Sequence, residues 1–155
     1  MRTPTAGTRR APAFTLVEIL IVVVILAILA AIVIPQFVSA SIEATKSSLH
    51  SQLKTINDQI EIYRVNNVGR LPTQDPVAPF GQNGSWGALV VVPYLKTTPF
   101  NMYAGGSVLA AGTSNDAYTA AKGSATGWFY QESGNRLFVW AAGYDERNNK
   151  LSVEP

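Results

Sequence analysis

The sequence predicts an α+β fold in which a long N-terminal helix, transmembrane in its first half and amphipathic in its second, packs on a small antiparallel β-sheet. Three observations predict this fold. A run of sixteen apolar residues, Ile19 to Ile34, begins close to the N-terminus. An apolar stripe at helical spacing follows it, and two strand-like segments near the C-terminus flank a turn. The 155 residues accordingly divide into four predicted segments: 1–13, 14–38, 39–68 and 69–155.

The first segment, residues 1–13, holds three arginines and two prolines, with no acidic side chain and almost nothing bulky and apolar. Such a segment cannot bury a core, so we interpret it as a cytoplasmic leader peptide. It also carries the excess of positive charge, because without its arginines 9 basic residues remain against 10 acidic ones. Nucleic-acid binding needs clustered cations on the folded part, so the charge pattern gives no sign of nucleic-acid contact.

The second segment, from Phe14 to Val38, is long and apolar enough to cross a membrane, which needs about 20 residues. The arginines before it favour an N-terminus in the cytoplasm and a head on the far side. A secretory signal cut near Ala31 or Ala40 and a plain membrane anchor are alternative interpretations. A plain anchor leaves the costly charge of Glu18 unexplained, unless that carboxylate gains from the positive N-terminal end of the helix dipole.

A local motif favours a third interpretation. Residues 13–19 read AFTLVEI, follow basic residues and precede the apolar run, with Pro35 further along. This pattern strongly resembles the N-terminal signal of type IV pilins and type II secretion pseudopilins. The resemblance implies a pilin-like fold, cleavage by a prepilin peptidase between Ala13 and Phe14, and methylation of the new amino group of Phe14. The family usually has glycine before the cut, and alanine, the smallest substitute, is expected to allow cleavage.

The same resemblance implies a role for Glu18 in assembly. The ammonium group freed on Phe14 would lie in a low-dielectric setting, where a buried charge needs a partner. In the family, the first residue of one mature subunit pairs with the fifth residue of a neighbour, which is Glu18 in this sequence. Such a pair would fix the axial register of a filament, because an unpaired buried carboxylate is costly.

The third segment, residues 39–68, continues the helix with an amphipathic pattern. One buried face is predicted by seven apolar residues at spacings of three, four or seven: Val38, Ile42, Leu49, Leu53, Ile56, Ile60 and Tyr63. Pro35, which lacks an amide hydrogen, is expected to kink or locally melt the helix ahead of this stripe. Residues 66–69 offer a C-terminal stop. His50 has no suitable sequence neighbour for catalysis, so we interpret it as a solvated or capping side chain.

The fourth segment is a head that is predicted to be rich in loops. Trp86–Val92 fits a short helix or a strand, and Ala104–Gly127 is interpreted as a long surface loop. Gly127–Gln131 and Arg136–Ala142 flank a four-residue turn and predict a β-hairpin, with a weaker third strand at Lys150–Val153. Three antiparallel strands with one apolar face would pack on the amphipathic part of the helix.

The head also resembles that of the major pseudopilin of type II secretion, so that the likeness covers residues 14–103. Residues 63–73, YRVNNVGRLPT, and 93–103, PYLKTTPFNMY, are similar to two of that family's signatures. The family often binds calcium in a C-terminal loop rich in aspartate, and the corresponding stretch is residues 143–149. Calcium takes six to eight oxygens, for which two carboxylates are few, so a solvated turn is favoured and Asp145 is the candidate ligand.

The residues that carry chemistry argue against an enzyme. No cysteine is present, and a single histidine excludes any two-histidine metal site. No carboxylate pair, phosphate-binding loop or catalytic triad is visible. Trp86, Trp128, Tyr130 and Trp140 allow a stacking platform for a ligand, but alternate strand positions favour the core of the sheet.

The sequence therefore predicts a structural subunit, made as a prepilin, of a type IV pilus-like filament or a type II secretion pseudopilus. The resemblance implies a single-pass protein of the inner membrane, with a cytoplasmic N-terminus and a periplasmic or extracellular head, that later joins a filament. The implied partners are the prepilin peptidase, further copies and minor subunits, and a membrane platform with a cytoplasmic ATPase. No cofactor is expected apart from the calcium candidate. The alternative is a membrane-anchored ligand-binding module that never polymerises and needs no freed Phe14.

Overall fold

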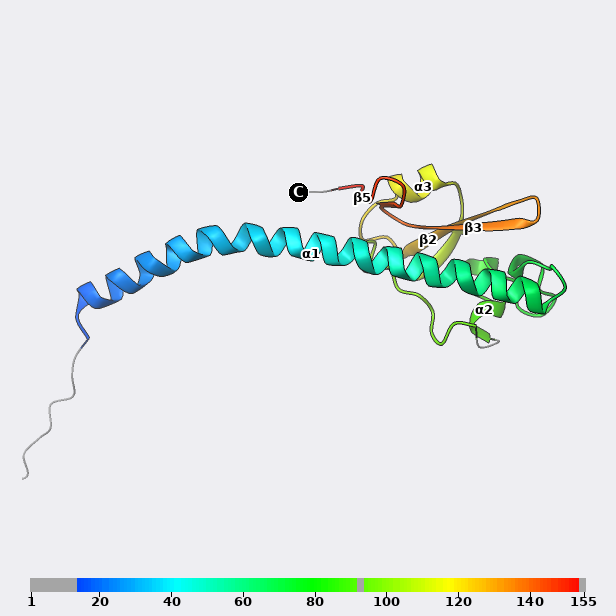
Figure 1. Ribbon diagram of the computed structural model, residues 1–155, viewed down its shortest axis with the longest axis horizontal. Helices are drawn as coiled ribbons and strands as arrows, with labels where there is room; N and C mark the ends of the chain where they lie inside the picture. Colours follow the sequence, from blue (N-terminus) through cyan, green and yellow to red (C-terminus); the bar gives the residue numbers. More distant parts are fainter. Residues whose placement is uncertain (1–13, 92–93, 154–155) are drawn as a thin grey trace, which may run out of the picture. The chain divides into compact units, whose positions relative to one another are not determined.

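The computed structural model describes residues 14–91 and 94–153 (Figure 1). The predicted leader, residues 1–13, lies outside the described residues. The chain divides into a first unit that ends at Ala40 and a second unit that begins at Ser41. Helix α1, Leu16–Asn66, contributes to both units, and the remaining helices and strands belong to the second.

The first unit is the apolar part of α1. Its large side chains are exposed along the whole length, from Leu16 at 81% to Val38 at 45%. By length and composition this helix can cross a membrane. The helix continues through Pro35 without interruption, so the expected local melting at that residue is wrong, whereas the kink stays a prediction.

In the second unit, α1 presents one face to a hydrophobic core. This face is at most 2% exposed and consists of Leu49, Leu53, Ile56, Ile60 and Tyr63. The predicted stripe is therefore confirmed for five of its seven residues. Ile42 packs partly buried against the same core, whereas Val38 is 45% exposed. Each such aliphatic side chain contributes about 1.5–3 kcal/mol on burial, so the face ties α1 firmly to the head.

The sheet consists of β1, Val108–Ala111, β2, Thr126–Ser133, and β3, Arg136–Ala141, in that order. Strands β2 and β3 form the predicted antiparallel hairpin, with Trp128 opposite Ala141. Strand β1 instead pairs parallel to β2. The predicted α+β class is confirmed, but the sheet is mixed rather than wholly antiparallel.

The segment Ala104–Gly127 is where the sequence-based prediction was wrong. Besides β1 it contains α3, Ser114–Thr119, which packs against β2 and β3. Helix α3 begins at a capping box, in which the Thr113 hydroxyl accepts from the Asp116 backbone N–H and the Asp116 carboxylate accepts from the Thr113 N–H. Figure 1 shows β2 and β3 between α3 and the second-unit part of α1.

The predicted third strand of the sheet also lies elsewhere. Strand β5, Lys150–Leu151, pairs antiparallel with β4, Tyr144–Asp145, in a separate two-stranded ribbon. The segment from Trp86 onward, left open between helix and strand, forms the short helix α2, Ala88–Val91. Two 3₁₀ turns, η1 at Pro72–Gln74 and η2 at Gln82–Gly84, carry the chain from α1 to α2.

Two of the four singled-out aromatic residues are core, as expected. Trp86 and Trp128 are 3% and 0% exposed, their rings meet edge to face at 5.8 Å, and Tyr130 packs partly buried against the same core. Trp140 differs, because along β3 it alternates with the buried Val139 and Ala141 and therefore points to the opposite face of the sheet. The prediction of a core position is wrong for Trp140.

The C-terminal end of α1 contains a strained residue. The helix ends at Asn66, and the Gly69 N–H closes the last turn by donating to the Arg64 carbonyl at 2.8 Å. Between them Val68 has a φ of 56° and is 99% exposed. A left-handed backbone costs a residue other than glycine about 1–2 kcal/mol, and asparagine tolerates it better than a β-branched side chain does.

We therefore expect Val68→Asn to raise the free energy of unfolding by about 1 kcal/mol. The measurement is thermal unfolding of the full chain in detergent, followed by tryptophan fluorescence. Val65→Asn is the matched control, since Val65 is also exposed, at 78%, but is helical, where valine and asparagine have similar propensity. An unchanged or lower midpoint for Val68→Asn would contradict the argument.

A hydrogen-bonded pair connects the end of α1 to the loop after it. The Tyr63 hydroxyl donates to Asp75 Oδ2 at 2.7 Å, and Asp75 Oδ1 accepts from the N–H groups of Ala78 and Val77. The Ala78 N–H and then the Tyr63 hydroxyl lower the pKa of Asp75. Burial, followed by the bond to Asp75, raises the pKa of Tyr63 to about 12.

This pair predicts a loss of stability at both ends of the pH range. The Asp75 contribution is present above the ordinary aspartate pKa of about 4 and disappears as pH falls through the lower folded-state pKa. The Tyr63 contribution is present below pH 10 or so and disappears as pH rises through about 12. Asp75→Asn should flatten the acid side of a plot of unfolding free energy against pH. Parallel acid profiles for the variant and the wild type would show that Asp75 is not responsible.

Candidate functional site

The N-terminal end of α1 carries the predicted assembly residue, Glu18, in a capping box. Glu18 Oε2 accepts hydrogen bonds from the N–H and the hydroxyl of Thr15, both at 2.8 Å. In return Thr15 Oγ1 accepts from the Glu18 backbone N–H at 3.2 Å. The box satisfies backbone donors that a helix start leaves without partners, and it explains why α1 begins at this point.

The box leaves part of the Glu18 carboxylate available. Both bonds from Thr15 reach Oε2, and within residues 14–91 and 94–153 no donor reaches Oε1. A carboxylate has room for about four hydrogen bonds, so Oε1 can accept an ammonium group without breaking the cap. Glu18 is thus held in one orientation by its own chain and remains open to a partner from another.

Phe14 lies two residues before Leu16, the first residue of α1, and is 77% exposed. The other side of the predicted cut, Ala13, lies outside the described residues. Thr15 is the participant that the sequence reasoning missed. Its signal was present, because a threonine three residues before an acidic one, at the start of an apolar run, is the pattern of a capping box.

The calcium candidate, Asp145, is engaged in its own turn. Its Oδ1 accepts from the N–H groups of Arg147 and Asn148, and its Oδ2 accepts from the Asn148 side chain at 2.7 Å. These bonds, that of the Asn148 side chain first, lower the pKa of Asp145. Across the described part of the chain no three histidine, cysteine or acidic residues gather as a metal site would need. Asp145 is thus held by the hydrogen bonds of its own turn, and calcium binding there stays a prediction.

His50 faces the same turn from α1. Its Nδ1 lies 3.8 Å from Glu146 Oε1, and both side chains are well exposed. An exposed pair at this distance contributes little to stability. The sequence could not reveal this pairing, because the two residues are 96 positions apart and only the fold brings them together.

Comparison with known proteins identifies the same N-terminal region as a family motif. The family description "Prokaryotic N-terminal methylation motif" matches residues 8–34, which include Phe14, Thr15 and Glu18. The type II secretion system core protein G of Dickeya chrysanthemi is 33% identical over 93 residues, 60% of this chain and 55% of that protein. Its counterpart in Pseudomonas aeruginosa is 39% identical over 66 residues, 43% of this chain and 46% of that protein. The chain thus spans about half the length of these relatives.

A third relative covers far more of the chain. The type IV wide pilus major component PilA4 of Thermus thermophilus is 30% identical over 121 residues, 78% of this chain and 81% of that protein. The chain belongs to the type IV pilin-like family. No solved structure matches this pilin-like chain significantly. Its capping box lies inside the matched methylation motif, and its exposed apolar helix fits membrane anchoring.

Proposed function

We propose that this pilin-like chain is a structural subunit, and not an enzyme, of a type IV pilus-like filament or a type II secretion pseudopilus. The observation that carries the proposal is the match of the methylation motif to the start of α1, whose apolar first part has exposed side chains. A relative that is a major pilus component, aligned over most of both chains, supports a filament. The core protein G relatives support the secretion form.

The chain would first be held in the inner membrane by residues 14–38, with the leader in the cytoplasm and the head outside. A prepilin peptidase would cut between Ala13 and Phe14 and methylate the new amino group of Phe14. The basic leader and the apolar segment after it support this orientation.

Assembly would move the apolar helix from lipid into a filament core. Lipid tails are as apolar as leucine, so this transfer gains little from the hydrophobic effect, and packing and polar contacts must decide the register. Glu18 is the one ionisable side chain between Phe14 and Ile42. Its Oε1, which no donor of the described residues reaches, would accept the ammonium group of a neighbour's Phe14.

The further partners follow from this role. Other copies of the chain and minor subunits would surround the apolar helix, since its exposed side chains need a cover outside lipid. Polymerisation would be driven by a membrane platform with a cytoplasmic ATPase, because the chain itself has no phosphate-binding loop in its sequence.

The test is the N-terminus of the mature protein. The full chain is co-expressed with a prepilin peptidase, recovered from membranes, and analysed by intact mass and N-terminal sequencing. We expect a terminus at Phe14 that carries one methyl group. Ala13→Gly is the matched control and should be cut at least as fast. An uncut chain would favour the anchored binding module, and a cut near Ala31 or Ala40 would rule out the filament.

A further inference from the structure

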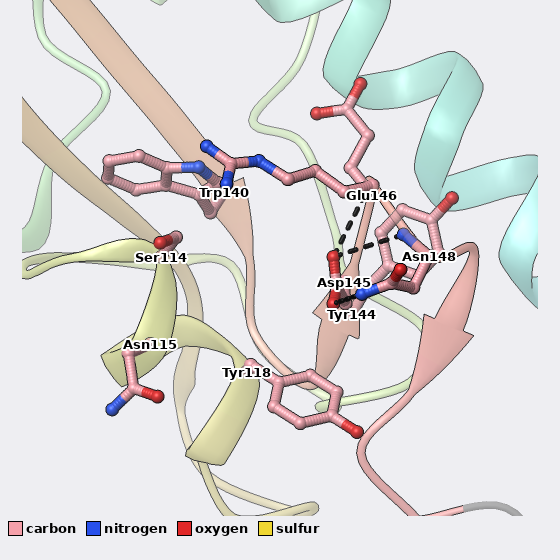
Figure 2. Close-up of a pocket in the computed structure, with 9 residues that line it drawn as sticks. Ser114, Asn115, Tyr118, Trp140, Tyr144, Asp145, Glu146 and Asn148 are labelled. Carbon is pink, nitrogen blue, oxygen red and sulfur yellow. Dashed lines mark hydrogen bonds between the residues drawn. The ribbon is translucent and has the colours of Figure 1, made fainter.

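A pocket of about 270 Å³ lies between α3, β3 and the turn from β4 to β5 (Figure 2). We call it the α3 pocket. Its lining includes Ser114, Asn115 and Tyr118 from α3, and Trp140 from β3. Figure 2 shows Trp140 and Tyr118 on different sides of the pocket, with Asp145 across from Ser114. Trp140 lines the pocket from the sheet face opposite to that of Val139 and Ala141, whereas Tyr144, also in the lining, belongs to the core.

Trp140 gives the pocket a flat apolar wall. Phe138 and Trp140 both point outward from β3, and their rings stack with centroids 6.1 Å apart and planes 10° from parallel. Trp86 and Trp128, by contrast, are buried in the core. Two stacked rings on the outer face are rigid, because an aromatic side chain has only two rotatable bonds. A ligand that lies flat on Trp140 would meet little entropic cost from the protein.

The polar side chains of the pocket fall into two groups. Asp145 is fixed by hydrogen bonds from the N–H of Arg147 and the side chain of Asn148. The side chains of Ser114 and Asn115 hydrogen-bond to no other residue in the part of the chain that the structure describes. A hydroxyl and an amide can both donate and accept, so these two residues suit a ligand with hydroxyl groups.

The charges around the pocket disfavour an ionic ligand. Asp145 opposes an anion, and Arg147, also in the lining, opposes a cation. Glu146 is directed to His50, from which it is 3.8 Å distant, and the oxygens of Asp145 already accept bonds from their own turn. Apart from the Arg147 guanidinium, the groups left for a ligand are an aromatic face, a hydroxyl and an amide, and these three are neutral.

We infer that the α3 pocket binds one pyranose ring of a neutral saccharide. A pyranose with equatorial hydroxyls presents its axial C–H bonds as an apolar face, which would lie on Trp140, while hydroxyls at the ring edge bond to Ser114 and Asn115. The pocket is smaller than the roughly 300–1,000 Å³ of sites for drug-sized ligands, which suits a single ring. The inference does not depend on the proposed filament, since a saccharide could bind the head of an assembled or an unassembled subunit.

Saturation-transfer NMR on the full chain tests this site. The protein is purified in lauryldimethylamine oxide, because detergents with a sugar head group would compete. The probes are methyl β-D-glucoside, methyl β-D-xyloside and methyl N-acetyl-β-D-glucosaminide, whose ring substituents are all equatorial. We expect transfer to the axial ring protons of at least one probe, with weak affinity.

Variants place the binding in the pocket. Trp140→Ala should weaken it by at least about tenfold, as for other aromatic anchors, and Trp140→Phe should keep part of it. Asn115→Ala, on the exposed side of α3, should weaken it several-fold and serves if Trp140→Ala fails to fold. Phe100→Ala is the matched control, since Phe100 is an exposed aromatic residue outside the pocket lining.

Three results would overturn the inference. The first is the absence of transfer to all three probes, and the second is equal transfer to wild type and to a folded Trp140→Ala or Asn115→Ala. The third is binding of lysine methyl ester, but of no sugar, in a Trp140-dependent way, which would reassign the α3 pocket to a cation.

Discussion

Glu18→Gln should remove nearly all filaments while leaving membrane insertion and cleavage intact. Glutamine retains the side-chain oxygen that accepts from Thr15, so the start of α1 should survive, because either residue completes a capping box. What glutamine lacks is the charge that would pair with the ammonium group of Phe14 in a neighbouring subunit. A buried charge left without its partner is strongly unfavourable, so we expect more than about a hundredfold loss of assembled subunits.

The variant separates the two interpretations of Glu18. If the carboxylate serves only to cap the helix and to interact with the positive end of the helix dipole, the Glu18→Gln subunit should assemble almost normally. The measurement is the amount of subunit in sheared filaments, by immunoblot and electron microscopy, against the processed subunit left in the membrane. Thr15→Ala is the matched control, because it removes the cap and keeps the charge, and it should reduce assembly only modestly. Normal filaments from Glu18→Gln would refute the pairing.

The parts of the fold that could be predicted have local signals. The buried face of α1 repeats over several turns, from Leu49 to Tyr63, and a repeat of that length identifies a helix and its inner side together. The β2–β3 hairpin has apolar alternation on both sides of a turn that contains Gly134. In both cases the residues that decide the structure are neighbours in the sequence.

The parts that were missed depend on distant partners. Strand β1 is four residues long, buries mainly Leu109, and is a strand only because it pairs in parallel with β2. Four residues are too few for a period to show. Helix α3 did leave a local signal, the Thr113–Asp116 capping box, although it is only six residues long. Lys150–Leu151 likewise pairs with β4 in a tight two-stranded ribbon and not with a strand of the main sheet.

The candidate site shows the same division. Ala13, Phe14 and Glu18 follow from a contiguous motif, whereas the outward position of Trp140 and the approach of His50 to Glu146 follow from the tertiary fold. The alternation along a strand predicts that Val139 and Trp140 lie on opposite faces of the sheet. Only the packing of the core determines which of the two faces is buried. Aromatic content drew attention to Trp140, and the saccharide contact inferred for it depends on that choice of side.

A second large effect is expected at Asn101, a polar residue that is 0% exposed. Its Nδ2 donates to the carbonyl oxygens of Gly127 and Ala142, at 2.8 and 2.9 Å, and its Oδ1 accepts from the N–H groups of Tyr103 and Ala104. All four hydrogen-bonding positions of the amide are thus used. They connect the loop before β1 to the start of β2 and to the residue after β3, so one side chain holds three segments together.

Asn101→Asp should therefore lower the free energy of unfolding by more than about 3 kcal/mol at neutral pH. Aspartate has nearly the same shape, but its carboxylate would face two carbonyl oxygens, out of contact with water, with no hydrogen to donate. The measurement is unfolding of the full chain followed by tryptophan fluorescence, and Asn115→Asp on the exposed side of α3 is the matched control. Burial raises the pKa of such an aspartate, so its penalty should shrink as pH falls and the carboxyl group takes up a proton. A variant as stable as the wild type at neutral pH would show that the backbone carbonyls find other donors. A loss of unfolding free energy that did not change with pH would show that lost hydrogen bonds, and not a buried charge, cause the destabilisation.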